Sequence, residues 1–187
     1  MKPSTLVIAI LLLQACASTP STPSEYLLSG PSESSSRQHH GTVDAALARV
    51  AVAEYLNRPE IVVETRDGVI QPAFAHRWAE PLEAGLRRAI ARVASDASGL
   101  VVLPDATAAA PLLVDVTIER FHGTESGRVT LAARWTVRRD DGISHHRMVD
   151  SVLTRADGYA ALVDAHDALV DTLAQGIGQS LKSPVGP

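Results

Sequence analysis

The stretch Val129-Thr130-Leu131-Ala132-Ala133-Arg134-Trp135-Thr136-Val137-Arg138 decides the fold of this chain. Apolar residues occupy the odd positions and mostly polar residues the even ones, which is the period of a β-strand with one buried and one solvated face. Residues 112–121 alternate in the same way, and turn signals follow at 123–127 and at Asp140-Asp141-Gly142. The sequence therefore predicts three consecutive antiparallel strands over 112–121, 129–138 and 144–154.

The remaining periodic segments predict further strands and two helices. Strands are expected at 25–28, 47–56 (a central strand), 61–66 and 100–103, and from Val69 after an Asp67-Gly68 turn. Pro72 should confine that last strand to an edge or a short piece. Helical spacing predicts helices over 78–94, with Pro81 in the first turn, and over 159–181. This order predicts an α+β fold, a two-layer sandwich in which two main helices pack on a mostly antiparallel sheet.

The amino terminus has the layout of a bacterial lipoprotein signal. Lys2 precedes an apolar run over 6–13, which ends in Leu13-Gln14-Ala15-Cys16, and the run is too short to span a bilayer. The tetrapeptide resembles a lipobox, which implies that Cys16 receives a diacylglyceryl group and that the new amine is acylated, for example with palmitate. Ala17, where an Asp would favour the inner membrane in this class, implies the outer membrane, facing the periplasm. The alternative is an ordinary cleavable signal with an incidental cysteine.

These features divide the chain into four parts. We expect a cleaved signal peptide at 1–15, a lipidated tether at 16–24, a folded domain at 25–182 and a flexible tail at 183–187. The net charge of −4 argues against nucleic-acid binding, which favours a basic face. Cys16 is the only cysteine, so its lipidation would leave no thiol for catalysis or metal binding, and no cofactor is expected beyond the covalent lipid.

The histidines predict no metal site. His145 and His146 are adjacent on a strand and should point to opposite faces, and the sequence has no His-x-x-x-His spacing. Asp164-x-His166-Asp167 could form a relay, but His166 falls on the apolar stripe of the last helix, which favours a satisfied, partly buried core histidine. Because the sequence also lacks a Gly-x-Ser-x-Gly elbow and a phosphate loop, we expect no enzyme.

Two surfaces remain as candidates for function. Arg134 and Arg138 line up with Thr130 and Thr136 on the face opposite Trp135, which is either an ordinary solvated sheet face or a docking surface for another protein. The second is a hairpin-to-helix junction at Arg77-Trp78-Ala79-Glu80-Pro81-Leu82. There Trp78 should anchor the helix on the sheet, and Arg77 should be exposed or paired with Glu80 or Glu83.

The junction is one of three segments that together resemble a known family. The second, upstream, is Glu54-Tyr55-Leu56-Asn57-Arg58-Pro59-Glu60-Ile61-Val62, and the third, which opens the last helix, is Gly158-Tyr159-Ala160-Ala161-Leu162-Val163. Their order and spacing resemble the ABC-type transport auxiliary lipoproteins of the paraquat-inducible protein C (membrane integrity) group. The similarity runs from Tyr26 to Leu181. It singles out Arg58, Pro59, Arg77, Trp78 and Pro81 as a partner-binding or structural motif. The Ser-rich insert at 31–42 is not part of the pattern.

The resemblance implies a lipid-anchored, non-enzymatic accessory component of an MCE-type (mammalian cell entry) lipid transport system. Its partners would be an MCE-domain protein and associated inner-membrane components, sometimes with an ABC ATPase, and it leaves open a homo-oligomeric ring. The alternatives are a periplasmic lipid carrier with an apolar pocket, and an anchored hydrolase. A carrier needs a sizeable apolar cavity, whereas a docking protein needs a filled core.

Overall fold

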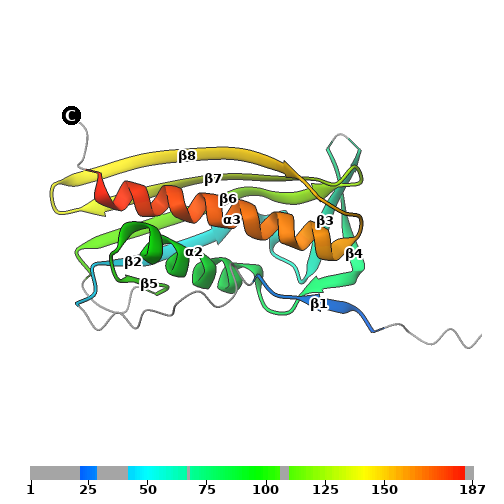
Figure 1. Cartoon of the computed structure of the whole chain (residues 1–187), viewed down its shortest axis with the longest axis horizontal. Helices are drawn as coiled ribbons and strands as arrows, with labels where there is room; N and C mark the ends of the chain where they lie inside the picture. The colour runs from blue at the N-terminus through cyan, green and yellow to red at the C-terminus, as the bar shows by residue number, and fades with distance from the viewer. Residues whose placement is uncertain (1–21, 29–41, 67, 106–109, 184–187) are drawn as a thin grey trace, which may run out of the picture.

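The fold is a strongly curled sheet closed by two helices (Figure 1). The structure, a computed structural model, describes residues 22–28, 42–66, 68–105 and 110–183. The signal peptide, Cys16, most of the tether and the His39-His40 loop lie outside the described residues, so the predictions made for them stay predictions. No helix among the described residues is long and apolar enough to cross a membrane.

The chain order is strands, helix, strands, helix, as predicted. The strands are β1 (Ser24–Tyr26), β2 (Ala45–Val52), β3 (Glu60–Arg66), β4 (Val69–Trp78), β5 (Val102–Leu103), β6 (Leu112–Thr124), β7 (Arg128–Arg139) and β8 (Gly142–Leu153). The helices are α2 (Leu82–Ser98) and α3 (Tyr159–Lys182), and a short 3-10 turn, η1 (Glu54–Leu56), follows β2.

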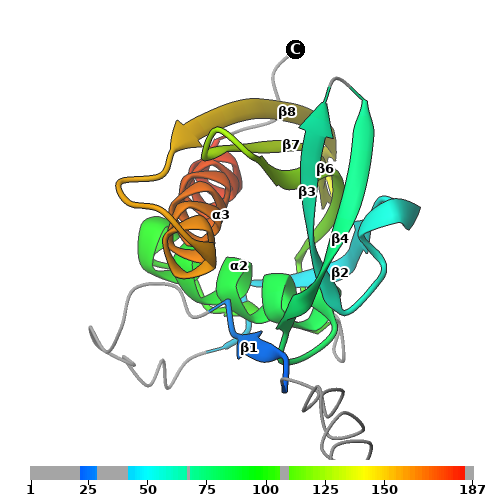
Figure 2. The same ribbon diagram turned by 90° about the vertical axis from the view of Figure 1, so that its right-hand side faces the viewer.

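β6 is the central strand of the sheet and pairs along both of its edges. β7 pairs along one of its edges, and β8 pairs with β7. The other edge is shared, because β2 pairs with the first part of β6 and β3 with its end, at Gly123 and Thr124. Figure 2 shows the resulting curl, with the strands on one side and α2 and α3 closing the other.

The predicted α+β sandwich is confirmed, with a sheet that is mixed. The two longest pairings, β6–β7 and β7–β8, are antiparallel, as is β3–β4. Parallel pairs join β1 to β4, β2 to β5, and β6 to both β2 and β3. These parallel pairs connect segments far apart in the chain, which alternation within one strand does not indicate.

The first helix begins later than predicted. Trp78 is the last residue of β4, and Pro81 is the N-cap residue of α2 rather than part of its first turn. A proline disfavours the helical conformation of the residue before it, here Glu80, and the Trp78 N–H is already used by a bond to the Pro59 carbonyl at 2.7 Å. The helix then continues past Ala94 to Ser98 and ends at Gly99, which adopts a left-handed conformation (φ 74°).

Two predicted strands also change in length. β2 ends at Val52, and the expected residues up to Leu56 form the turn η1 instead. β4 continues through Pro72 to Trp78. Pro72 pairs with Val62 of β3 and lies outside the part of β4 that pairs with β1, so β4 is an edge strand at this position. The register between β3 and β4 shifts between Glu60 and Val62, so residues 73–76 of β4 have no partner among the described residues of β3.

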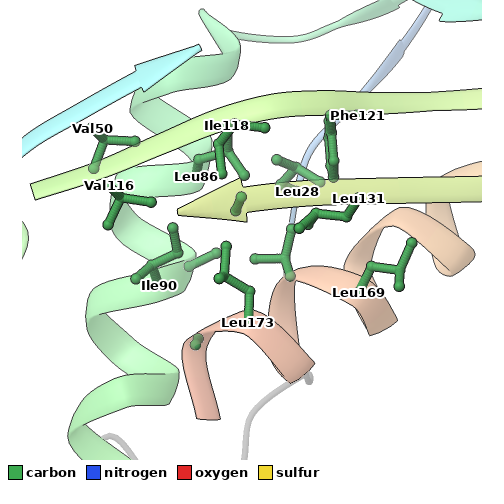
Figure 3. Close-up of a cluster of buried hydrophobic side chains, with 14 of the residues drawn as sticks. Leu28, Val50, Leu86, Ile90, Val116, Ile118, Phe121, Leu131, Leu169 and Leu173 are labelled. Atoms are coloured by element: carbon green, nitrogen blue, oxygen red, sulfur yellow. The ribbon is translucent and has the colours of Figure 1, made fainter. Parts of the chain in front are cut away.

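The core lies between the sheet and the two helices (Figure 3). Leu47, Ile90, Ile118 and Leu173 are among its fully buried side chains. The helices approach closely at Gly178 of α3, where an added Cβ would lie 2.8 Å from the Ala97 Cβ and 2.9 Å from the Ala94 carbonyl oxygen. Glycine near the end of α3 therefore allows α3 to pack against α2, and this offsets its poor helix propensity.

Candidate functional site

The five residues singled out from the sequence line one surface groove. This junction groove has a volume of about 420 Å³ and lies where the loop before β3, the end of β4 and the start of α2 meet. It is lined by Arg58, Pro59, Arg77, Trp78 and Pro81, together with Glu25, Asn57, Ala79, Glu80 and Leu82. Residues separated by some twenty positions in sequence are thus neighbours in space.

Backbone hydrogen bonds hold the walls of the junction groove together. The Trp78 N–H donates to the Pro59 carbonyl at 2.7 Å, and the Ala79 N–H donates to the Tyr26 carbonyl at the same distance. β1 therefore pairs beside the groove, with Glu25 opposite Arg77. The groove sits at the point where the segment that follows the predicted tether enters the domain.

The charged side chains of the groove pair differently from the prediction. Arg77 is partly exposed, and its partner is Glu25 rather than Glu80 or Glu83, with Nε donating to Oε1 at 3.0 Å. Glu80 instead accepts from Arg88, one of the charged residues of α2, and this contact holds the pKa of the Glu80 carboxyl below its usual range. Because α2 starts at Leu82, Glu80 reaches along the helix toward Arg88.

Arg58 differs from Arg77, the other basic residue in the lining of the groove. It is exposed, and within the described residues no ion pair involves its guanidinium. Pro59 and Pro81 are exposed as well, whereas Trp78 is buried at 6% exposure. Arg58 and the two prolines are thus accessible to a partner, while Trp78 supports the groove from beneath.

Trp78 packs in an aromatic cluster with Phe121 and His166. Its ring centroid lies 6.1 Å from that of Phe121 and 5.6 Å from that of His166, and Phe121 and His166 are 4.5 Å apart. Because His166 belongs to α3 and Phe121 to β6, the cluster ties the groove to both layers. Trp78 thus anchors the sheet to a helix as predicted, although that helix is α3.

His166 is more deeply buried than predicted. It is 1% exposed, and its Nδ1 donates to the Leu162 carbonyl of its own helix at 2.7 Å. Its Nε2 is buried without a hydrogen-bond partner among the described residues. The predicted core position is therefore confirmed, but the ring is fully rather than partly buried and only one of its two nitrogens is hydrogen-bonded. Burial lowers the pKa of His166 to about 4, so the ring is neutral, and its bond to a backbone carbonyl rather than a carboxylate argues against the Asp164-His166-Asp167 relay.

A second histidine forms a hydrogen-bonded chain that the sequence did not indicate. With His122 protonated at Nε2, the Tyr55 hydroxyl donates to Nδ1 at 2.9 Å and Nε2 donates to the Glu64 carboxylate at 3.3 Å. The chain links η1, β6 and β3. Burial raises the pKa of the Tyr55 hydroxyl, and the bond from the Gly68 N–H, together with His122, lowers the pKa of the Glu64 carboxyl. Tyr55 is therefore a hydrogen-bond donor rather than a nucleophile.

The outer face of β6–β8 has the predicted polar character. Arg134 and Arg138 are exposed and pair with Glu119 and Asp115 of β6 at 3.2 and 3.1 Å. A shallow depression of about 360 Å³ lies between these side chains and the histidines of β8.

His145 is exposed on this face, while His146 stacks against Trp135 with ring centroids 5.2 Å apart, so the two adjacent rings point apart as expected. Within the described ranges, no group of three or more His, Cys, Asp or Glu side chains could hold a metal ion.

The largest of the surface hollows described lies at the amino-terminal end of α3. It has a volume of about 630 Å³, is open to solvent, and is lined largely by polar or small residues of the β6–β7 turn and the start of α3, such as Thr124, Ser126 and Gly158. Val63, Tyr159 and Leu162 add apolar surface to its wall, but the hollow is open and would not enclose an acyl chain. The core itself is filled by packed side chains.

The fold and these sites define a small α+β domain whose candidate functional surfaces are an ion-paired groove and a polar sheet face. The chain belongs to the family of ABC-type transport auxiliary lipoprotein components, whose family model matches residues 26–178. This confirms the family that the sequence resembles. By that membership the chain is an auxiliary component of a transport system.

Two curated relatives match almost the whole chain. They are the intermembrane transport lipoprotein PqiC of Escherichia coli (strain K12) and the protein of the same name from Shigella flexneri. Each is 27% identical over 188 residues, which cover 97% of this chain and 98% of the relative. The alignment thus includes the amino-terminal region as well as the domain.

Solved structures share the fold. The crystal structure of an uncharacterized protein superposes with a TM-score of 0.75 at 22% identity, covering 87% of this chain and 100% of that protein. A Xanthomonas campestris protein gives a TM-score of 0.67 at 16% identity, covering 84% of this chain and 95% of that one. At these identities the likeness concerns the fold alone, and it agrees with the α+β architecture.

Proposed function

We propose that this chain is a lipid-anchored, non-enzymatic accessory component of an MCE-type intermembrane lipid transport system. Cys16 carries the lipid, the domain faces the periplasm from the outer membrane, and it docks an MCE-domain protein that arrives with its inner-membrane components. In this role it supports the integrity of the envelope. Its family and its match to PqiC over 97% of the chain are the observations that carry the proposal.

The geometry of the amino terminus supports a domain held close to the membrane. Eight residue steps lead from Cys16 to Ser24, the first residue of β1. At about 3.3 Å per extended residue, they reach at most roughly 25 Å. The junction groove, which includes Glu25, therefore lies at the tethered side of the domain.

A docking role fits the interior better than a carrier role. A carrier would need an apolar cavity that encloses an acyl chain. The hollows among the described residues, including one of about 540 Å³ with a mainly apolar wall that contains Leu27 and Leu28, are open to solvent and do not enclose a ligand. The filled core leaves binding to the surface. Arg58, Pro59 and Pro81 are exposed in the junction groove and would make the contact, with Trp78 as its buried support.

The lipid anchor is tested by Cys16→Ala. The variant should keep its signal peptide, incorporate no radioactive palmitate and leave the outer-membrane fraction. Ala17→Asp is the matched control, because it should still incorporate palmitate but remain in the inner membrane. Palmitate labelling of Cys16→Ala would refute the anchor.

The docking role is tested by Arg58→Glu. Co-purification of an MCE-domain protein with the wild-type lipoprotein should fall at least tenfold for this variant. Arg66→Glu is the matched control, since Arg66 is also exposed and, within the described residues, has no ion pair. Equal recovery from both variants would exclude the junction groove, and no recovery of an MCE protein with the wild type would exclude the partner.

A further inference from the structure

β8 offers a long, regular and unpaired strand edge. It runs from Gly142 to Leu153, pairs with β7 in an unbroken register, and has no other strand partner in the part of the chain that the structure describes. Figure 1 shows it along the rim of the sheet. Such an edge can accept an added strand unless bulges, prolines or lysines protect it, and β8 contains none of these.

Two hydrogen bonds show which backbone groups face the free side. The Thr154 N–H, just beyond β8, donates toward β7, to the Gly127 carbonyl at 2.8 Å. Because N–H directions alternate along an antiparallel strand, the odd-numbered residues of β8 direct their N–H and C=O groups away from β7. In agreement, the Ser151 N–H bonds to the Asp150 carboxylate rather than to a strand. The groups of Ile143, His145, Arg147 and Val149 are thus available for pairing.

The same odd-numbered residues present their side chains on the outer face. Ile143, Val149 and Leu153 are 52%, 58% and 59% exposed, which is high for aliphatic residues, and His145 and Arg147 are exposed between them. Each exposed side chain lies beside one from β7, such as Arg134 opposite Arg147 and Arg138 opposite Ile143. An added strand would therefore meet the apolar side chains of Ile143, Val149 and Leu153 and the cationic side chain of Arg147.

The outer face is also more positive than the chain as a whole. The paired strands carry Arg128, Arg134, Arg138 and Arg147 there, against the two carboxylates Asp115 and Glu119 that pair with three of them. The chain, in contrast, has a net charge of −4. A ligand that complements this face is acidic, whereas a second copy of β8 would add another Arg147 to a face that is already positive.

We propose that the free edge of β8 binds an extended, acidic segment of another protein, with apolar side chains between its carboxylates, as an additional strand of the sheet. Backbone hydrogen bonds to residues 143–149 would supply the affinity, and Arg147 with its neighbours would select the charge. The inference needs neither the lipid anchor nor an MCE protein, so it can fail while the proposed function stands.

The probe is a fluorescent twelve-residue peptide in which glutamate alternates with valine. Fluorescence anisotropy with the full mature protein in neutral detergent micelles should show saturable binding. A matched peptide with lysine in place of glutamate should bind at least tenfold more weakly. Two further peptides carry N-methyl groups on alternate amides of the glutamate peptide, one on the odd-numbered and one on the even-numbered amides. Only one of the two should lose binding, because only one side of the added strand pairs with β8.

Val149→Pro tests the edge itself. It removes an N–H that faces away from β7, so the β7–β8 ladder and the far-UV circular dichroism should remain, while peptide affinity falls at least tenfold. Val149→Thr keeps the N–H and the branched side chain and should bind like the wild type. Arg147→Glu should reverse the preference between the two peptides.

Three outcomes would overturn the proposal. They are absence of binding by the wild type at millimolar peptide, unchanged binding by a folded Val149→Pro variant, and equal binding of both N-methylated peptides. Self-association of the wild type that Val149→Pro abolishes, without peptide binding, would assign the edge to a second copy instead.

Discussion

His122 and His166 are both buried, at 7% and 1% exposure, yet their surroundings differ in every other respect. His122 has a partner at each ring nitrogen, the Tyr55 hydroxyl and the Glu64 carboxylate. His166 has a partner only at Nδ1 and is otherwise enclosed by the rings of Trp78 and Phe121. The first histidine is a polar link between strands, and the second is a packing element that must remain neutral.

The difference separates two ways in which burial can affect a titratable group. Around His166, desolvation dominates and opposes the charged form, so its pKa falls to about 4. His122 instead has a hydrogen-bond partner at each ring nitrogen, one of them the Glu64 carboxylate at 3.3 Å. Acid should therefore act on the aromatic cluster beneath the junction groove, where Nε2 of His166 is buried and has no hydrogen-bond partner among the described residues.

The largest expected effect is acid destabilisation through His166. As the pH falls below 6.5, the unfolded chain takes up a proton on this residue, while the folded protein does so only near pH 4. The contribution of the neutral His166 ring to the free energy of unfolding is therefore fully present above pH 6.5. It is lost as the pH falls to about 4, and the loss amounts to about 3 kcal/mol in total. Urea unfolding from pH 7.5 to 4 should show this loss in the wild type.

His166→Leu is the matched variant for that experiment. It should retain stability near that of the wild type at pH 7.5, because a side chain of similar size replaces a ring whose Nε2 makes no hydrogen bond. The difference in stability between the two proteins should then change by about 3 kcal/mol in favour of the variant by pH 4. Parallel pH profiles would show that His166 is not the group responsible.

The second test, Tyr55→Phe, removes one of the two hydrogen bonds to the His122 ring. It leaves Nδ1 of His122 without its donor, which should cost about 1 kcal/mol at pH 7.5. Tyr159→Phe is the control, because the Tyr159 ring stacks on His76 and, among the described residues, its hydroxyl makes no hydrogen bond. Urea unfolding should leave the control within a few tenths of a kcal/mol of the wild type. Equal losses in both would mean that the Tyr55 bond adds nothing.

The two histidines also show what can be predicted from the sequence. Helical spacing places His166 on the buried stripe of α3, because that stripe is a local property of one helix. For His122, strand alternation fails, because a register shift between Ile118 and Arg120 reverses the faces of β6 beyond it. Phe121 is the available signal, since it breaks the even-numbered apolar series and lies in the core.

Contacts between segments far apart in the chain determine the features of the fold that periodicity within one segment does not predict. The strands β6 to β8 and the helix α3 follow from alternation and helical spacing within each segment. The start of α2 depends instead on Pro59 and Tyr26, whose carbonyls fix the chain at Trp78 and Ala79. The ion pair of Arg77 with Glu25 arises in the same way, from the pairing of β1 with β4. Resemblance to a family motif, not periodicity, singles out the five groove residues, and the structure shows that they line one groove.

The smallest expected effect concerns Glu64 and sharpens the role of His122. The pKa of Glu64 is lowered first by the bond from the Gly68 N–H and then by His122. In His122→Ala the pKa should therefore rise only part of the way to its usual value, because the Gly68 bond remains at 2.6 Å. NMR titration of the side-chain carboxyl carbons measures this, and the pKa of Glu80, which depends on Arg88, should not change. A Glu64 pKa that is unchanged in His122→Ala would mean that the 3.3 Å contact between Nε2 and the carboxylate carries no charge coupling, and His122 would then resemble His166 as a packing residue.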